Sequence, residues 1–501
     1  MEGIYERGTG ILCHISSLPN NYGIGSLGDE AYEFARLLKK SRVKYWQILP
    51  LVQTGYGNSP YSSVCCNSGN PLFIDLKALC RQGLLDEEEL ASAELPAGGV
   101  DYDAIYARRF DILRLAYARF NVKDKEFTAF VDKGEFDDYA TFMSLKSRYG
   151  GSFDTFPDAY KNKERLAMLE FKRSVYKSDY LFWQFLQFIF EKQWLKLKNY
   201  VNSLGIKIIG DIPLYVAYDS SDVWGNPALF TLDKNLNPTS VAGVPPDYFS
   251  ETGQLWGNPL YNWEAMAENN YDWWIKRIEH AAKLYDIIRI DHFRGLDRYY
   301  SIPADSETAE TGEWLPGPGI RLFSEIRRRV GEVAIIAEDL GVMDGGVIRL
   351  RERTGYPGMK ILQFAFDGRE DNEYLPVNIG ENSVVYTGTH DNNTTLGFLN
   401  EMEDDEFAVF KTRLRAALKS EGVTYPFVDR AGAAVAMNVC ALASRAEIAI
   451  LPVQDLMGLG GEARMNIPST PAGNWEFRME KYPSRKNWAV LRKITEYFDR
   501  V

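Results

Sequence analysis

Three acidic residues of this chain each close, or closely follow, a short run of branched apolar residues. Asp291 lies in IIRIDHFRG, Glu338 in AIIAEDLG and Asp391 in VVYTGTHDNN. Apolar runs of this kind are typical of strands that are buried on both faces of a parallel sheet. Each acid is therefore predicted to lie where a strand ends and a loop begins. In parallel-barrel enzymes, that face bears the chemically active residues.

Runs of the same kind recur along the chain and predict eight core strands. They cover residues 10–15, 45–51, 206–213, 286–291, 334–338, 360–366, 384–388 and 449–455. Amphipathic helical patterns separate several of them, at residues 30–40, 319–330, 346–354 and 431–446, and another ends the chain at 487–501. This alternation predicts an α/β fold with a parallel sheet. Eight repeats favour a closed (β/α)8 barrel (a TIM barrel), and a doubly wound open sheet is the alternative.

The spacing of the predicted strands is uneven. About 150 residues separate the second strand from the third, which is far more than a connection needs. Within them, residues 80–204 are largely helical in pattern and are expected to form an inserted helical subdomain. Residues 218–270, after the third strand, are rich in Gly, Pro, Asn and aromatic side chains and are expected to form a loop-rich insertion over the active face. No linker divides the chain, so residues 1–501 are expected to be one catalytic unit.

Composition narrows the class of protein. The net charge of −12 argues against nucleic acid or an anionic membrane surface as a partner. The N-terminal MEGIYERGTG has no apolar signal core, and no stretch of 18 apolar residues occurs, so a cytoplasmic protein is expected. The 13% of aromatic residues suits sugar rings, whose C–H faces pack on aromatic planes, although a large aromatic core is the simpler alternative.

The cysteine and histidine content predicts neither disulfides nor a metal centre. Five cysteines, of which Cys65 and Cys66 are adjacent, show no paired framework and fit free thiols in a reducing compartment. Four histidines without an HExxH or CxxC motif give no transition-metal site. The sequence therefore implies neither a cofactor nor a catalytic metal.

Two of the three acids are candidates for a catalytic pair. Arg289 and Asp291 are two residues apart on a predicted strand, so their side chains share a face. Arg289 is then expected to lower the pKa of Asp291 and keep it ionised as a nucleophile. Neighbouring strands lie ~4.8 Å apart, which lets Glu338 approach the ~5–5.5 Å carboxyl separation of retaining glycosidases. A structural Arg–Asp pair, and a capping role for Glu338, are the alternatives.

Glu338 would act as proton donor and then as base, with a pKa raised by burial and by the charge of Asp291. Asp391 would bind sugar hydroxyls and help to distort the ring, with His390 and His292 donating to hydroxyls. An ordinary paired His–Asp is the alternative at Asp391. Asp211, at the end of the third predicted strand, is expected either to bind hydroxyls or to be structural.

Two loop motifs offer a further binding surface. TGYGNSPYSS follows the second predicted strand and provides Tyr56, Ser59 and Tyr61. GEARMNIPST and GNWEFR follow the eighth and provide Asn466 and Trp475. Ordinary Gly/Pro/Asn turns are the alternative for each loop.

Taken together, these segments resemble the 4-α-glucanotransferase family (amylomaltase, or disproportionating enzyme), one of the α-retaining barrel enzymes that include the α-amylases. The resemblance covers nearly the whole chain in order, through GILCHISSLP, GYGNSPY, GDIPLYVA, VPPDYFSETGQLWGNPLYNW, RIDHFRG, AEDLG, GTHDNNT, RMNIPST and GNWEFR. It implies a (β/α)8 barrel with inserted subdomains and without a separate C-terminal β-sandwich domain.

The resemblance also implies roles for individual residues. Asp291 looks like the nucleophile, Glu338 like the acid/base and Asp391 like the transition-state carboxylate. The residues that resemble those around the reacting sugar are Arg289, His390 and Asp211.

Two loops resemble further glucan-contacting segments of the family. Tyr248 and Phe249, with Trp256 just beyond, resemble the acceptor-side lid. Tyr56 lies in a loop that provides a second glucan contact away from the catalytic centre. One departure is visible, because RMNIPST has Ser469 where a Gly is expected.

The expected activity is the transfer of α-1,4-glucan segments to the 4-hydroxyl of an acceptor glucan or glucose, through a β-glucosyl–aspartyl intermediate. The expected partners are α-1,4-glucans and maltooligosaccharides, with glucose as an acceptor. An α-amylase-like hydrolase with the same acids is one alternative. A non-catalytic glucan-binding protein on the same barrel is another.

Overall fold

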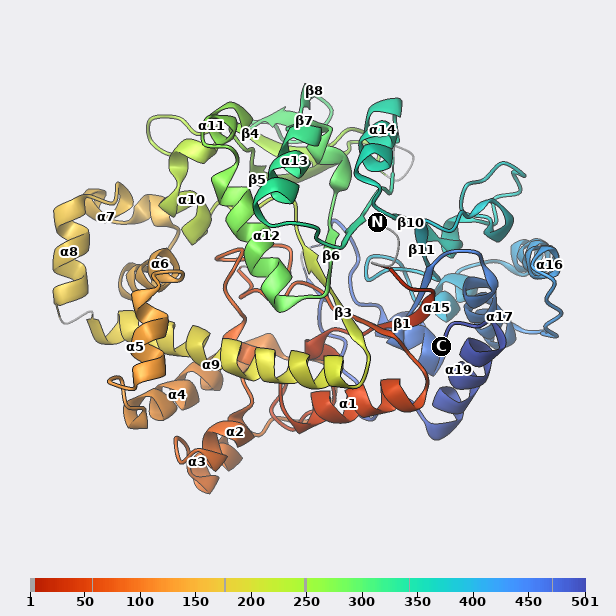
Figure 1. Cartoon of the computed structure of the whole chain (residues 1–501), viewed down its shortest axis with the longest axis horizontal. Helices are drawn as coiled ribbons and strands as arrows, with labels where there is room; N and C mark the ends of the chain where they lie inside the picture. Colours follow the sequence, from red (N-terminus) through yellow and green to blue (C-terminus); the bar gives the residue numbers. More distant parts are fainter. Residues whose placement is uncertain (1–4, 56, 175–176, 247–249, 342, 471) are drawn as a thin grey trace.

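Eight parallel strands close into a barrel in the order β1-β12-β11-β10-β9-β6-β3-β2 (Figure 1). The computed structural model describes residues 5–55, 57–174, 177–246, 250–341, 343–470 and 472–501. The barrel strands are β1 (Gly8–Leu12), β2 (Tyr45–Gln47), β3 (Lys207–Ile212), β6 (Ile287–Ile290), β9 (Ile335–Ala337), β10 (Gly358–Ile361), β11 (Ser383–Tyr386) and β12 (Ile448–Pro452). The eight predicted core strands are confirmed, and the closed barrel is the correct alternative.

Side chains along each barrel strand alternate between its interior and its helix-covered outer face, as the pleat requires. On β3, Ile209 packs inside the barrel, whereas Ile208 packs outward with the helices. At the lower end, the Tyr5 hydroxyl donates to the carbonyl of Ile335 at 2.6 Å and accepts from the N–H of the same residue at 2.9 Å. Tyr5 thus fills the base of the barrel and leaves the opposite end for chemistry.

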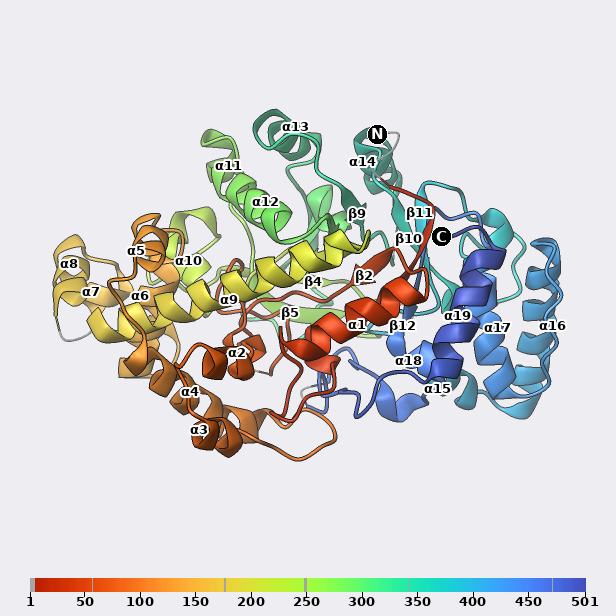
Figure 2. The same cartoon turned by 60° about the horizontal axis from the view of Figure 1, so that its bottom comes forward.

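Helices cover the outer face of the barrel. Helices that alternate with the barrel strands along the chain are α1 (Asp29–Lys40), α12 (Asp272–Leu284), α13 (Ile320–Arg329), α14 (Gly345–Thr354), α15 (Thr395–Asn400), α16 (Asp404–Ser420), α17 (Arg430–Ala443), α18 (Val453–Met457) and α19 (Arg485–Tyr497). Of these, α16 packs against α17. Figure 2 shows α1 beside the long helix α9 (Lys177–Ser203), and α19 beside α17.

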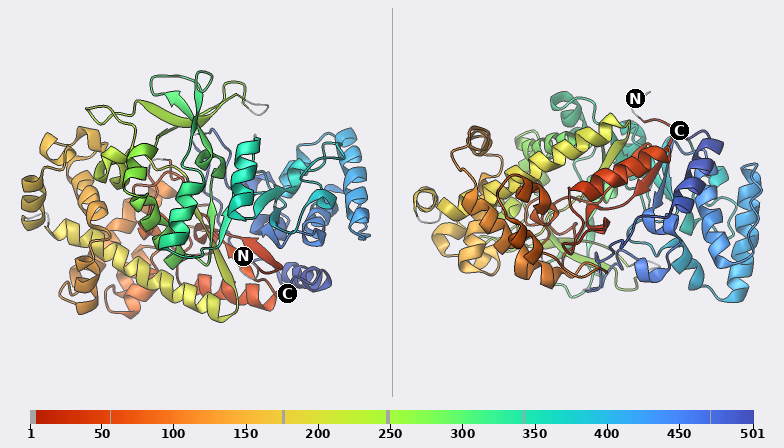
Figure 3. Two further views of the ribbon diagram at one scale, coloured as in Figure 1. Left: turned by 45° about the horizontal axis from the view of Figure 1, so that its top comes forward. Right: turned by 90° about the horizontal axis from the view of Figure 1, so that it is seen from below.

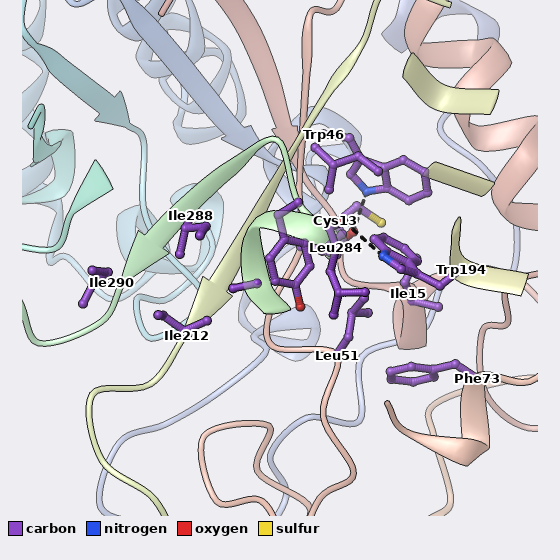
Figure 4. Packing of buried hydrophobic residues seen from close by; sticks show 14 of the residues in the cluster. Cys13, Ile15, Trp46, Leu51, Phe73, Trp194, Ile212, Leu284, Ile288 and Ile290 are labelled. Carbon is purple, nitrogen blue, oxygen red and sulfur yellow. Dashed lines mark hydrogen bonds between the residues drawn. The ribbon is translucent and has the colours of Figure 1, made fainter. Parts of the chain in front are cut away.

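Two buried indoles each join neighbouring segments, one within the barrel and one between the covering helices α9 and α12 (Figure 4). The Trp46 indole N–H donates to the carbonyl of Cys13 at 2.8 Å, and that of Trp194 donates to Leu284 at 3.1 Å. Each large apolar side chain therefore buries its ring while its one polar atom keeps a partner.

Between β2 and β3 the chain is mostly helical. The elements are η2 (Pro71–Phe73), α2 (Leu76–Arg81), α3 (Glu87–Ser92), α4 (Tyr102–Arg119), α5 (Lys125–Asp132), α6 (Asp137–Tyr149), η3 (Phe153–Thr155), α7 (Asp158–Lys161), α8 (Arg165–Arg173) and α9. Residues 80–204, expected to be largely helical, are thus mostly helix in the structure.

A four-stranded sheet, in the order β5-β4-β7-β8, stands apart from the barrel (Figure 3). Its strands are β4 (Ser240–Val244), β5 (Gln254–Pro259), β7 (Arg298–Pro303) and β8 (Glu313–Pro316). β4 and β5, with α10 (Ser221–Gly225) and α11 (Trp263–Glu268), lie in the segment that composition described as loop-rich. These strands are short and rich in Gly, Asn and Pro, so they lack the apolar runs that reveal the barrel strands.

Short 3₁₀ turns complete the described elements: η1 (Ile15–Ser17), η4 (Pro227–Leu229), η5 (Phe293–Leu296), η6 (Leu362–Phe364), η7 (Pro376–Asn378) and η8 (Gly461–Ala463). The five cysteines are all unpaired, as expected. Among the described helices, none has both the length and the apolar character needed to cross a membrane.

Candidate active site

Asp291 and Glu338 lie next to each other at the mouth of the barrel. They directly follow Ile290 and Ala337, which are register partners on the adjacent strands β6 and β9. The sheet ladder continues to both acids, because Asp291 N–H donates to Ile212 O at 3.0 Å and Glu338 N–H donates to Ile290 O at 3.1 Å. Two carboxylates are thereby fixed at neighbouring strand ends, which lie ~4.8 Å apart in a sheet.

Arg289 binds two acids at once. Its guanidinium is 2.6 Å from the Asp211 carboxylate and 3.0 Å from that of Asp291. The Asp211 side chain is fully buried, whereas that of Asp291 is 29% exposed. The Tyr61 hydroxyl donates to the same Asp211 oxygen at 2.7 Å. Asp211 therefore binds Arg289 on its buried side. Asp291 binds it on the side that faces the open end of the barrel.

The ionisation of Asp291 reflects two opposed effects. Burial raises its pKa well above the usual range, and the negative charge of Glu338 adds to this, while Arg289 acts in the opposite direction. Arg289 thus lowers the pKa of Asp291, as expected, but burial raises it by more, so the predicted net lowering is wrong. Burial likewise raises the pKa of Glu338, which is the expected direction, and Arg289 and two main-chain N–H donors oppose it.

The Glu338 carboxylate is held by main-chain groups on both oxygens. The N–H of His292 donates to Oε2 at 2.6 Å, and the N–H of Leu340 donates to Oε1 at 3.0 Å. Neither donor depends on a side chain. The orientation of this carboxylate is therefore set by the loops after β6 and β9.

Asp391 lies in the loop after β11 and has its own set of donors. Asn466 Nδ2 donates to Asp391 Oδ1 at 2.7 Å, and His390 Nε2 lies 3.4 Å from the same oxygen. Arg464 donates to the main-chain carbonyl of Asp391 at 2.6 Å. The Asp391 side chain is 48% exposed, so one carboxylate oxygen is fixed while the group as a whole reaches solvent.

An aromatic cluster joins Asp391 to the Arg289 cluster. The Tyr61 ring stacks on His390 with centroids 4.9 Å apart and planes at 14°, and Trp475 lies 5.8 Å from both rings. Burial lowers the pKa of His390, so its imidazole is neutral near pH 7. Because Tyr61 also binds Asp211, one side chain links the two halves of the site.

The four-stranded sheet reaches the site through Trp256 on β5. Its indole meets the His292 ring edge-on, with centroids 4.8 Å apart, and 38% of the residue is exposed. Tyr215 packs against both rings at 6.3–6.4 Å. Trp256 and His292, both predicted binding residues, therefore form one aromatic corner.

The remaining predicted residues fall into two groups. The Ser59 hydroxyl accepts the main-chain N–H of Tyr61 at 3.2 Å, so Ser59 shapes the turn that presents Tyr61 and makes no described contact with the acids. Tyr56, Tyr248 and Phe249 lie outside the described residues.

Sequence reasoning did not find the Arg464 contact or the two main-chain donors to Glu338. Arg464 lies two residues before Asn466, a predicted binding residue, in GEARMN. This proximity in sequence was the only indication that Arg464 lies at the site. The N–H donors have no signal in residue identity, since almost any residue supplies an N–H. Among the described residues, no group of three or more His, Cys, Asp or Glu side chains is arranged to hold a metal ion.

Comparison with known proteins gives one consistent result. Residues 13–484 match the glycosyl hydrolase 77 family, described as 4-alpha-glucanotransferase. A 4-alpha-glucanotransferase of Streptococcus pneumoniae is 46% identical over 481 residues, which cover 95% of this chain and 93% of that protein. One from Thermus thermophilus is 44% identical over 506 residues, covering 99% of each.

Solved structures agree with this match. The amylomaltase from Streptococcus agalactiae in complex with acarbose superposes with a TM-score of 0.93 at 36% identity, covering 99% of this chain and 100% of that one. The amylomaltase from Corynebacterium glutamicum shares the fold, with a TM-score of 0.81 at 17% identity over 99% of this chain and 75% of that one.

Proposed function

This chain belongs to the 4-alpha-glucanotransferase family, and from that premise we propose that Asp291, Glu338 and Asp391 perform its glucan transfer by a retaining double displacement. The observation that supports this best is the placement of Asp291 and Glu338 directly after register partners on adjacent strands. Two carboxylates at that spacing suit a nucleophile and an acid/base acting on one sugar.

In the first step, Glu338 protonates the glycosidic oxygen of an α-1,4-glucan while Asp291 attacks the anomeric carbon. The C–O bond to the reducing-end fragment breaks, the fragment leaves with the proton of Glu338, and a β-glucosyl ester forms on Asp291. Arg289 binds Oδ1 of Asp291 at 3.0 Å, which leaves Oδ2 for the attack. Arg289 also favours the ionised form of Asp291 that the attack requires.

In the second step, the 4-hydroxyl of another glucan replaces the leaving fragment. The Glu338 carboxylate removes its proton, the new C–O bond forms, and Asp291 is released. Two inversions at one carbon give net retention of the α configuration. Both the acid and the base role need a carboxylate that keeps its position between steps, which the main-chain donors of His292 and Leu340 provide.

Asp391 is assigned to the reacting sugar. Asn466 and His390 fix one of its oxygens, and the other can accept from sugar hydroxyls in the distorted ring. His390 and the buried Asp211–Arg289 pair complete the surroundings of this sugar. Tyr61 and Trp475 offer the flat faces on which C–H surfaces pack.

The acceptor is assigned to the Trp256–His292 corner. Tyr248 and Phe249 are proposed to form the adjoining lid, and Tyr56 to provide a glucan contact away from the centre. Exclusion of water from the ester separates transfer from hydrolysis. A Phe249→Ala variant is therefore expected to raise the ratio of hydrolysis to transfer, and an unchanged ratio would count against the lid.

The proposed donors are α-1,4-glucans and maltooligosaccharides, with glucose as one acceptor. The S. agalactiae amylomaltase was solved with acarbose, and its likeness to this chain supports a glucan in the same site. We further propose that residues 80–204 act as an inserted helical subdomain of a single catalytic unit, and that the enzyme acts in the cytoplasm.

The test is incubation of the purified protein with maltotriose alone, with products resolved by chain length over time. A ladder of longer maltooligosaccharides plus glucose, at a constant number of reducing ends, is expected. Rising reducing ends would instead identify a hydrolase. An Asp291→Asn variant should lose the activity in either case, and undiminished activity would remove Asp291 from the mechanism.

A further inference from the structure

His292 has a main-chain conformation that is unusual for its residue type. It follows Asp291 and precedes η5, with φ +48° and ψ +49°, in the left-handed region. Residues with a Cβ disfavour this region, although His tolerates it better than most. Such conformations persist where the surrounding structure enforces them, and they gather at functional sites.

The consequence of this conformation is the direction of two successive N–H groups. The N–H of His292 donates to Glu338 Oε2 at 2.6 Å, and the N–H of Phe293 donates to the Glu338 carbonyl at 3.1 Å. Consecutive N–H groups converge on one acceptor region when a left-handed residue interrupts the chain, as in anion-binding nests. With an extended residue at this position, the N–H groups of residues 292 and 293 would point in diverging directions and could not both reach Glu338.

The His292 side chain has different contacts. Its imidazole meets the edge of Trp256, with centroids 4.8 Å apart, and makes no described contact with Glu338. Burial lowers the pKa of His292 to about 4, so the ring is neutral at working pH. Main chain and side chain therefore serve two separable purposes at this residue.

We propose that His292 is a positioning residue whose left-handed main chain, and not its imidazole, fixes the Glu338 carboxylate for proton transfer. The proposal rests on the acid/base role assigned to Glu338. An N–H donor stabilises the carboxylate more than the carboxylic acid, so it lowers the pKa of Glu338 against the effect of burial. Loss of this donor should raise that pKa.

Glu338 must be protonated for the first step, so kcat/KM falls as pH rises through its pKa. A weakened His292 donor should therefore move the alkaline limb of the pH profile to higher pH.

Four substitutions that all remove the imidazole separate the two purposes: His292→Gly, His292→Asn, His292→Ala and His292→Val. Gly adopts positive φ freely, Asn tolerates it, Ala resists it, and a β-branched Val resists it most. We expect Gly and Asn to keep the parent alkaline limb, Ala to move it upward, and Val to move it furthest, by ~0.5–1 pH unit. All four should raise KM, because each loses the contact with Trp256.

Thermal unfolding of each variant accompanies the profiles. If Val does not fold, the comparison of Ala with Gly and Asn decides the question. An equal upward shift in all folded variants would assign the effect to the imidazole and overturn the proposal, as would an unmoved limb in Ala and Val. Glu338→Gln, measured in parallel, tests the underlying role: retained activity there would overturn the assignment of Glu338 itself, whatever the His292 series shows.

Discussion

Single residues at this site act largely by holding others in place. Asn466 was expected to contact substrate, and its observed partner is the carboxylate of Asp391, at 2.7 Å. The donor orients Oδ1 of Asp391 and leaves Oδ2 for the sugar. Loss of one preorganised hydrogen bond of this kind costs a large share of transition-state stabilisation.

Asn466→Asp replaces the donor with a second negative charge beside Asp391. We expect kcat/KM for maltotriose disproportionation to fall ~100-fold, and ~10-fold for Asn466→Ala, because repulsion adds to the lost bond only in the first. Initial rates of glucose release measure both. Asn382→Asp adds the same charge at a distant residue that bonds the Gly355 carbonyl, and should leave the rate unchanged. Equal losses in the two Asn466 variants would argue against the electrostatic part of this account.

Ser469 has a left-handed backbone conformation, which a residue with a Cβ disfavours. The family resemblance led us to expect Gly here, and the structure gives Ser469 a φ of +64°. Ser469→Gly removes the left-handed cost of a Cβ, partly offset by the greater freedom of Gly in the unfolded chain. We expect a gain of ~0.5 kcal/mol in the free energy of unfolding, measured by denaturant titration. Ser92→Gly, at the end of α3, should lose stability instead, and a loss at Ser469 as well would contradict the explanation.

At the scale of elements, β3 depends on close contact with the helix layer. Gly210 precedes Asp211, and a Cβ built on it would lie 2.1 Å from the Tyr285 ring. Gly210→Ala must displace β3 or Tyr285, so we expect it to cost ~2 kcal/mol of stability. Since β3 positions the Asp211–Arg289 pair, kcat should fall as well. Both quantities come from one preparation, by urea titration and maltotriose turnover.

Gly380 provides the matched control for the Gly210→Ala substitution. It lies before β11, has nothing within 4 Å of a built Cβ, and does not have a left-handed φ. Gly380→Ala should change stability by less than ~0.5 kcal/mol. A comparable loss at Gly380 would mean that Gly210 is sensitive for reasons other than the contact with Tyr285.

The same scale shows why some elements could be predicted and others could not. Barrel strands are apolar on both faces, so continuous runs reveal them, although the predicted run 449–455 continues past Pro452, where β12 gives way to α18. β4 and β5 are short, partly exposed and interrupted by Gly or Pro. The rest of their sheet lies far along the chain, because β4 pairs with β7, and β7 pairs with β8. Pairing of that kind depends on tertiary contacts that local patterns do not encode.

The site follows the same division. The three acids could be placed because each adjoins an apolar run. Their surroundings could not, because they depend on the backbone direction at His292 and on the contact of Arg464, after β12, with the Asp391 carbonyl in the loop after the neighbouring strand β11. Neither the backbone direction nor the contact can be predicted from the identity of the side chains alone.

At the scale of the whole molecule, Arg500 links the segments next to the paired barrel strands β1 and β12. Its side chain is fully buried and donates to five main-chain carbonyls, and to no carboxylate of the described residues. The acceptors lie at the start of β1, at the end of α17 and in the turn between α17 and β12: Gly8, Leu442, Ser444, Ala446 and Glu447. Burial lowers the pKa of Arg500 to about 9, which leaves it protonated at neutral pH.

Arg500→Met keeps the apolar stem but removes all five donors. The orphaned carbonyls stay buried, so we expect a loss of about 3 kcal/mol or more in the free energy of unfolding. Urea titration should show the lower midpoint at an unchanged slope. Since β1 and β12 are neighbours in the barrel, the loss should lower the stability of the whole cooperative unit and not that of the C-terminal segment alone, as the unchanged slope would report.

Arg492 supplies the comparison. It lies on α19, the helix that ends just before Arg500, with its side chain 48% exposed and paired with Glu496 on the surface. Arg492→Met should cost less than ~1 kcal/mol, because exposed ion pairs contribute little. If both substitutions cost the same, the loss comes from α19 as a helix. If only Arg500→Met is costly, one buried cation that binds carbonyls from both sides of the β1–β12 junction stabilises the closed barrel on which every distance at the active site depends.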